Sequence, residues 1–261
     1  MEAQDNTAPH REERPGGRGF LVAAGKVFFK VRDALFPLIF FGLAFVSRPA
    51  LAGGSRAWDT ALDVLGIAVA LAGQLLRAMV IGFAYVRRGG KDKQIYADSL
   101  QQEGFFAHCR NPLYVGNFLA LVGFCLIYNS LLCYLVAIPF FAFAYAAIIA
   151  AEEQFLRGRF GAEYADYCRR VPRIIPNFRG LGRSLEGMEF DWKRLVRKEY
   201  GSTYAGVCAI LVLLVWEHWV FQGYPGCRPI IVGAVAVWIP LTAAYLVARY
   251  LKKSGALGTG H

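Results

Sequence analysis

Long apolar blocks separated by charged segments constrain the fold of this chain most strongly. Hydrophobic residues make up 56% of its 261 residues, and the mean hydropathy is positive. That share exceeds the one typical of a soluble domain, and apolar blocks of about 20 residues match the thickness of a bilayer core. We therefore predict an all-α, polytopic membrane helical bundle of about six transmembrane helices with interfacial amphipathic helices. The predicted spans are residues 34–47, 62–86, 113–128, 131–151, 202–222 and 229–250.

The net charge of +10 is distributed in a pattern that indicates membrane topology. Lys and Arg number six in residues 1–33, five in 87–112, eleven in 152–200 and three in 249–261, and the segments between these hold few. Cytoplasmic loops carry the excess of positive residues in membrane proteins, so we expect both termini on the cytoplasmic side. Anionic lipid headgroups then account for the positive charge, and we expect no nucleic acid partner.

Polarity along the chain divides it into three parts. We expect residues 1–19 to form a disordered polar tail, 20–200 a membrane core with a cytoplasmic cofactor pocket, and 201–261 two additional transmembrane helices. Residues 1–19 lack the features of a signal peptide. The last two helices are expected to shape a lateral lipid entrance or a dimer surface, so assembly into a homo-oligomer stays open. The cysteines form no Cys-x-x-Cys pair and the histidines are scattered, so we expect no metal site.

Two short motifs flank the third and fourth predicted spans. Asn111–Gly116 enters the helical hairpin formed by these spans, and the adjacent Glu152 and Glu153 leave it. Carboxylates are costly near hydrocarbon, so we interpret the pair as part of a cofactor pocket at the membrane surface. Structural interpretations exist for each feature alone: a solvated helix end for Glu-Glu, a capped helix start for Asn-Pro, and an interface anchor for Tyr114.

The motifs together resemble those of two families of membrane methyltransferases. Asn-Pro-x-Tyr-x-Gly, a hairpin and Glu-Glu are similar to the phospholipid N-methyltransferases, and the flanking sequence resembles the isoprenylcysteine carboxyl methyltransferases. The resemblance covers about residues 62–178. The matching residues are Arg110 to Gly116, Glu152, Glu153, Leu156, Phe160, Gly161, Tyr164, Tyr167, Val171, Pro172 and Pro176.

The resemblance implies a pocket for S-adenosyl-L-methionine on the cytoplasmic side. It implies catalytic roles for Arg110 and Glu152, and we expect Glu152 to be the base that takes a proton from a lipid ammonium. No metal is required, because methyl transfer from a sulfonium is a direct displacement that depends on alignment. The cofactor-binding residues implied are Asp98, Ser99, Leu100, Gln101, Phe106, Asn111, Pro112, Leu113, Tyr114, Glu152 and Glu153.

Two departures from the carboxyl methyltransferase pattern bear on the acceptor. Asn111 replaces a His, and an amide does not titrate near neutrality. Ile148 replaces an Arg that contacts the substrate in that family. Both changes favour a phosphatidylethanolamine-type amine as the methyl acceptor, with carboxyl O-methylation of an isoprenylcysteine-like substrate as the alternative.

Other functions remain open from the sequence alone. Membrane sterol reductases resemble the same helical core and use a nicotinamide cofactor, and a non-catalytic membrane scaffold is a further alternative. Arg77, inside the second span, either snorkels or bonds to a neighbouring helix, or it belongs to the cofactor pocket. Glu217 and His218 either face a cavity or reach the membrane interface.

Overall fold

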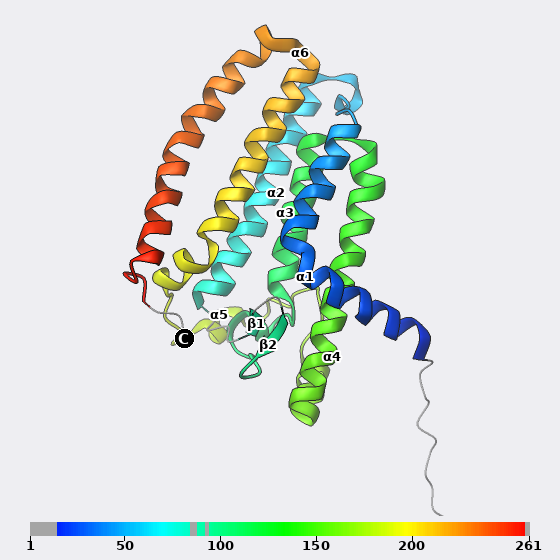
Figure 1. Ribbon diagram of the computed structural model, residues 1–261, viewed down its shortest axis with the longest axis vertical. Helices are drawn as coiled ribbons and strands as arrows, with labels where there is room; N and C mark the ends of the chain where they lie inside the picture. Colours follow the sequence, from blue (N-terminus) through cyan, green and yellow to red (C-terminus); the bar gives the residue numbers. More distant parts are fainter. Residues whose placement is uncertain (1–14, 84–87, 92–93, 259–261) are drawn as a thin grey trace, which may run out of the picture.

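The computed structural model describes residues 15–83, 88–91 and 94–258, and it is a bundle of long α-helices (Figure 1). This confirms the predicted all-α membrane bundle. Of the predicted polar tail, residues 1–14 lie outside the described residues, and residues 15–19 form the first turn of the first helix. The elements in chain order are α1 (Pro15–Val46), a 3₁₀ turn (Ala52–Gly54), α2 (Arg56–Phe83), β1 (Arg88–Lys91), β2 (Gln94–Ala97), a second 3₁₀ turn (Gly104–Ala107), α3 (Pro112–Tyr128), a π-helical segment (Cys133–Ala137), α4 (Ile138–Arg170), α5 (Leu181–Leu185) and α6 (Trp192–Lys253).

Helical segments lie at all six predicted span positions. Three helices are long and apolar enough to cross a membrane: α2, the continuous helix Cys133–Arg170 and α6; α3 is apolar but shorter. The last two predicted spans are the two arms of α6, which reverses direction at Gly223 (Figure 1). Gly223 has φ 65°, a value that a residue without Cβ adopts at little cost. Pro225 follows in the first turn of the second arm, where its missing N–H leaves no bond unmade.

A two-stranded antiparallel hairpin, β1–β2, adds strands to the predicted helical elements. It pairs Arg88 with Ala97 and Lys91 with Gln94 in the predicted polar loop between the second and third spans. Its strands are short and local, so the helical periodicity that indicates the bundle carries no signal for them.

Glycines bring α2 and α3 into close contact. Gly66, Ala70 and Gly73 lie on or near one stripe of the second span, and small residues let membrane helices approach closely. A Cβ on Gly66 would lie 2.7 Å from the carbonyl oxygen of Gly123, and one on Gly73 would collide with the carbonyl oxygen of Gly116. Both pairs are seven residues apart on their helices, so they form two matched contacts of an antiparallel pair. This packing fixes the start of α3, which carries the first motif.

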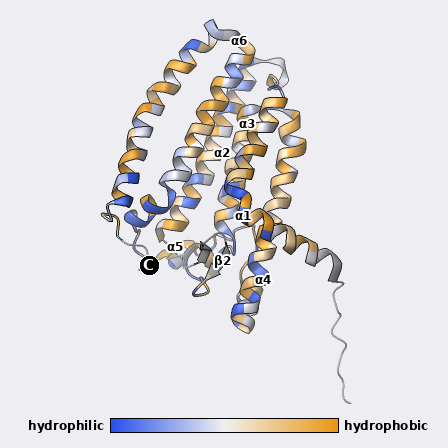
Figure 2. Ribbon diagram, in the orientation of Figure 1, coloured by the Kyte–Doolittle hydropathy of each residue, from blue (hydrophilic) through white to orange (hydrophobic). Residues whose placement is uncertain are grey.

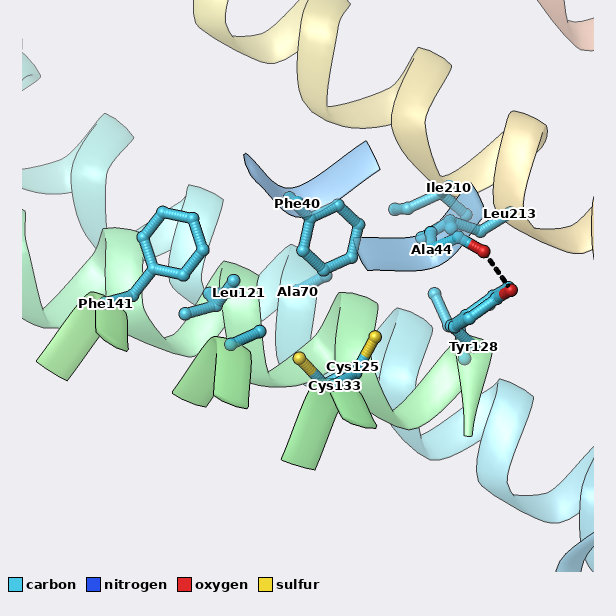
Figure 3. Packing of buried hydrophobic residues seen from close by; sticks show 12 residues of the cluster. Phe40, Ala44, Ala70, Leu121, Cys125, Tyr128, Cys133, Phe141, Ile210 and Leu213 are labelled. Atoms are coloured by element: carbon cyan, nitrogen blue, oxygen red, sulfur yellow. Dashed lines mark hydrogen bonds between the residues drawn. The ribbon is translucent and has the colours of Figure 1, made fainter. Parts of the chain in front are cut away.

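The turn between α3 and α4 is anchored to α1. Asn129 adopts a left-handed conformation with φ 43°, and the hydroxyl of the buried Tyr128 donates to the carbonyl oxygens of Ala44 and Ser47 at 2.5 and 2.9 Å. Figure 3 shows Tyr128 beside the packed residues of α1, α2, α3 and α6. A π-helical segment, Cys133–Ala137, ends directly before α4, and Pro139 stands in the first turn of α4.

α4 continues beyond the apolar part of the bundle. Its lower end and the start of α6 are hydrophilic (Figure 2). Four residues of the methyltransferase-like pattern are buried here: Leu156, Tyr164, Tyr167 and Val171 form one cluster. The hydroxyl of Tyr167 donates to the carbonyl oxygen of Phe106 at 2.7 Å, so this cluster holds the loop before α3 against α4.

Candidate functional site

A polar cavity of about 450 Å³ lies at the hydrophilic end of the bundle. Four long helices, α1, α2, α4 and α6, contribute to its wall together with α3 and the loop before it. The lining residues are Arg32, Asp33, Phe36, Arg77, Ile81, Phe106, Asn111, Leu113, Tyr114, Asn117, Tyr145, Glu152, Arg194, Lys198 and Glu199. Five of these are predicted cofactor-binding residues: Phe106, Asn111, Leu113, Tyr114 and Glu152.

The two sequence motifs meet in this cavity through Tyr114 and Glu152. Tyr114, in the first turn of α3, donates its hydroxyl proton to Oε1 of Glu152 on α4 at 2.7 Å. Arg32 of α1 donates from Nη1 to the same hydroxyl oxygen at 3.2 Å, and the ring of Tyr114 lies 5.7 Å from that of Tyr145. The carboxylate of Glu152 is therefore oriented by Tyr114, whose hydroxyl is fixed by Arg32 and whose ring is fixed by Tyr145.

A second polar network lies deeper along α2 and involves Glu199 of α6. Arg77 donates from Nε to Oε2 of Glu199 at 3.0 Å and from Nη2 to Oε1 at 2.6 Å, a forked arrangement. Arg77 also donates to Asn117 of α3, and Gln74 donates to Glu199 at 3.1 Å. Arg77 thus bonds to neighbouring helices and also lines the cavity. The sequence left a structural bond and a place in the pocket as alternatives, and in the structure Arg77 has both.

Asn111 does not cap α3 with its side chain. Its Nδ2 donates instead to the carbonyl oxygen of Arg173 at 3.0 Å, and the backbone N–H of Arg110 donates to that of Pro172 at 2.9 Å. The segment that follows α4 therefore runs beside the first motif. The Val-Pro part of the sequence pattern positions Asn111 at the cavity wall.

Arg110 and Glu153 occupy a different place from Glu152. Glu153 is buried and forms ion pairs of 3.1 Å with both Arg110 and Arg173. Burial disfavours the charge of Arg110, but the carboxylate of Glu153, together with Cys168 and Tyr164, outweighs this and raises the pKa of Arg110 above its usual value. Neither Arg110 nor Glu153 is among the residues that line the cavity. The pair joins the loop before α3 to α4.

The predicted loop Asp98–Gln101 spreads over three environments. Ser99 and Gln101 line a smaller cavity of about 280 Å³, which shares Arg194 with the polar cavity. Leu100 packs on the cluster around Tyr164, and Asp98 is exposed. Pro112 is buried in the first turn of α3.

Most of the remaining cavity residues come from helices outside the motif pattern. α1 supplies Arg32, Asp33 and Phe36, and α6 supplies Arg194, Lys198 and Glu199. One signal for Glu199 is present in the sequence: Arg77 lies within a membrane span, and a buried charge requires a partner of opposite sign.

The opposite end of the bundle holds a separate group of buried acids. Glu217 is fully buried beside Asp59 and Asp63 of α2, and Arg56 lies 3.6 Å from Asp59. Glu217 therefore faces the protein interior. His218 is turned back on its own helix, where its Nδ1 lies 2.9 Å from the carbonyl oxygen of Leu214.

Comparison with known proteins identifies the segment that carries these motifs. Residues 62–163 match the model of the phospholipid methyltransferase family. The match covers most of α2, all of α3 and most of α4. It confirms the resemblance recognised from Tyr114, Glu152 and their neighbours.

Two curated relatives match about half of the chain. The cobalt-zinc-cadmium resistance protein CzcN of Cupriavidus metallidurans is 34% identical over 142 residues, 51% of this chain and 60% of the relative. The nickel-cobalt-cadmium resistance protein NccN of Alcaligenes xylosoxydans xylosoxydans is 30% identical over 135 residues, 49% of this chain and 58% of the relative. The chain thus spans less than two thirds of either protein. No solved structure matches it significantly.

Proposed function

We propose that this protein transfers a methyl group from S-adenosyl-L-methionine to the polar head of a membrane-embedded lipid or lipidated acceptor, with a phosphatidylethanolamine-type amine as the preferred acceptor. The observation that carries the proposal is the contact of Tyr114 with Glu152 at 2.7 Å on the wall of one polar cavity. These residues come from the two motifs of the family-matched segment, and their contact supports a donor pocket at this position.

The cavity fits a donor of this type in size and in charge. Its volume of about 450 Å³ lies in the range of about 300–1,000 Å³ typical of small-molecule sites. The donor carries a carboxylate, an ammonium and a sulfonium, and the lining offers cations such as Arg32 and Lys198 and carboxylates such as Glu152 and Asp33. Asn111 adds an amide that donates and accepts hydrogen bonds.

The chain's own residues supply alignment and proton transfer. S-adenosyl-L-methionine, when bound, supplies a methyl group activated on a sulfonium sulfur. Oε1 of Glu152 is engaged by Tyr114, and Oε2 of the same carboxylate is the atom that takes the proton of a lipid ammonium. Phe106, Leu113 and Ile81 exclude water from one wall of the cavity. Arg77 and Glu199 keep α6 against α2, which closes the other wall.

Calorimetric titration of the detergent-purified protein with S-adenosylmethionine and S-adenosylhomocysteine tests the proposal first. We expect saturable binding by the wild type and retained binding by Glu152→Gln, with turnover abolished in that variant. Glu153→Gln is the matched control, because Glu153 is the next residue but pairs with Arg110 and Arg173 outside the cavity. Thermal unfolding of both variants separates lost binding from lost folding.

The outcomes distinguish the alternatives. Turnover retained by Glu152→Gln would remove the base role. No donor binding by a folded protein would remove methyl transfer, and titration with nicotinamide cofactors would then separate a reductase from a scaffold. Methyl transfer to an isoprenylcysteine-like carboxylate but not to lipid amines would select the second acceptor class.

We also infer that the cavity and both ends of the chain face the cytoplasm and contact anionic lipid headgroups. The inference rests on the Lys and Arg excess at the end of the bundle where α4 ends and α6 begins. Both described chain ends lie at this end (Figure 1). Labelling of a Ser254→Cys variant with a membrane-impermeant thiol reagent in sealed vesicles of known orientation checks it.

The printed names of the two relatives associate those proteins with metal resistance. Among residues 15–83, 88–91 and 94–258, no group of three or more His, Cys, Asp or Glu side chains is arranged to hold a metal ion. Our proposal for this chain therefore rests on the polar cavity and on acceptors that are lipids.

A further inference from the structure

An apolar groove of about 660 Å³ lies between α2 and the two arms of α6. We call it the interarm groove. Its lining residues come from three segments: 71–78 of α2, 195–204 of the first arm and 241–251 of the second arm. Glu199 lines both this groove and the polar cavity, so the two spaces adjoin at the Arg77–Glu199 ion pair.

The first turns of α6 present different chemistry to the two spaces. Arg194 and Lys198, one helical turn apart, line the polar cavity, whereas Leu195 and Tyr200 line the groove. A ligand that occupied both spaces would need a polar head of negative charge and a hydrocarbon tail. This is the composition of a phospholipid.

The polar atoms that border the groove are engaged by protein partners. Gln74 donates to Thr203 at 2.8 Å and to Glu199 at 3.1 Å. The hydroxyl of Tyr204 lies 3.2 Å from that of Thr242. Apart from Tyr200 and Tyr245, the other side chains of the lining are hydrocarbon, so the groove offers a polar occupant little to bind.

The second arm of α6 forms the outer wall of the groove without packing densely on the bundle. No residue of the most apolar 18-residue window of α6 is buried. The arms touch through the stacked rings of Tyr204 and Tyr245, whose centroids are 4.5 Å apart, and Lys252 lies 5.1 Å from the ring of Tyr200. In a membrane, the medium around this hairpin is lipid, so acyl chains are the molecules that reach the groove.

We propose that the interarm groove binds one acyl chain of a membrane phospholipid while its phosphate lies near Arg194 and Lys198, which presents the head to the polar cavity. The proposal rests on the methyl transfer proposed above. It gives the second arm of α6, which lies outside the family-matched residues 62–163, a role in selecting acceptors by their tails. Because bilayer tails are as apolar as the groove, the groove selects by shape and position and gains little hydrophobic free energy.

A pair of neighbouring alanines on the second arm provides the test. Both are exposed, but Ala244 lines the groove, whereas Ala243 lines neither the groove nor the polar cavity. We expect Ala244→Trp to raise the KM for dioleoyl phosphatidylethanolamine at least tenfold. In the same variant, the KM for dihexanoyl phosphatidylethanolamine, whose chains are too short to fill the groove, and the affinity for S-adenosylhomocysteine should stay unchanged. Ala243→Trp should behave as wild type. Ala78→Phe, which fills the groove from α2, is the second variant if Ala244→Trp does not fold.

Equal kinetics of Ala244→Trp and Ala243→Trp would overturn the proposal, as would an equal loss with both acceptor lengths. If no acceptor is methylated at all, the proposed function fails separately, and native mass spectrometry of the purified proteins still tests the groove. Phospholipid retained by wild type and Ala243→Trp but lost from Ala244→Trp would support the groove. Equal retention by all three would reject it.

Discussion

Arg77 of α2 and Glu199 of α6 form a forked ion pair, with distances of 3.0 Å from Nε to Oε2 and 2.6 Å from Nη2 to Oε1. The two side chains are 15% and 5% exposed. The pair joins the family-matched segment to the helix that follows it and borders both the polar cavity and the interarm groove. It is the main polar link between the motif helices and α6.

Removal of one partner of this pair should destabilise the protein strongly. Glu199→Ala leaves the guanidinium of Arg77 buried without its carboxylate, and breaking a buried pair in this way costs about 3–5 kcal/mol. The double variant Arg77→Met/Glu199→Ala removes both charges and should recover much of the loss. Thermal unfolding of the wild type, Arg77→Met, Glu199→Ala and the double variant in a double-mutant cycle measures the coupling. Additive losses would contradict it.

Several elements of the fold were predictable because they depend on local periodicity. The small-residue stripe of α2 indicates a close approach to some neighbouring helix, and the spacing from Leu156 to Val171 indicates a single helical face; the structure supplies α3 as the neighbour and buries that face. The turn at Asn129 was predictable for the same reason, since it lies between two apolar runs. Each of these features is specified by residues that are close in sequence.

The candidate site was predictable only in part, because its geometry depends on how helices rotate against one another. Glu152 and Glu153 are adjacent and chemically equal, and only the rotation of α4 places one at the cavity and the other between Arg110 and Arg173. The pairing of Arg77 with Glu199 joins residues 122 positions apart. No local pattern selects that partner.

Close packing of α2 on α3 predicts a specific sensitivity at Gly66. An added Cβ would lie 2.7 Å from the carbonyl oxygen of Gly123 and 2.8 Å from a side-chain carbon of Ile127, so Gly66→Ala should force the helices apart. We expect a loss of about 1–3 kcal/mol, as for other overpacked sites. Gly42→Ala in α1 is the matched control, since nothing lies within 4 Å of its added Cβ. Unfolding temperatures in detergent compare the two, and equal temperatures would argue against tight packing.

The hydroxyl of Tyr114 should matter for turnover more than for stability. Tyr114→Phe removes the bonds to Glu152 and Arg32 but keeps the ring beside Tyr145. Hydrogen bonds to charged groups contribute about 1.5–3 kcal/mol, so we expect kcat to fall by about 10–100-fold. Tyr134→Phe, which removes a hydroxyl bonded to Asn129 at the other end of the hairpin, should leave kcat unchanged. A comparable loss in both variants would indicate general damage instead.

Asp191, the N-cap of α6, predicts that stability depends on pH. The backbone N–H of Arg194 donates to its Oδ1 at 2.8 Å, and this bond, with the nearby guanidinium, holds the pKa of Asp191 below its usual value. A carboxyl group whose pKa falls on folding stabilises the folded state above its unfolded pKa, and the contribution is lost as the pH falls through its folded pKa.

Asp191→Asn keeps a capping acceptor without the charge. Its unfolding temperature should therefore lie below that of the wild type at pH 7, and the gap should narrow as the pH falls through the folded pKa of Asp191. Asp191→Ala, which lacks the acceptor as well, should unfold at a lower temperature than Asp191→Asn over the whole range. A gap between wild type and Asp191→Asn that stays constant with pH would show that the charge at this cap does not stabilise α6.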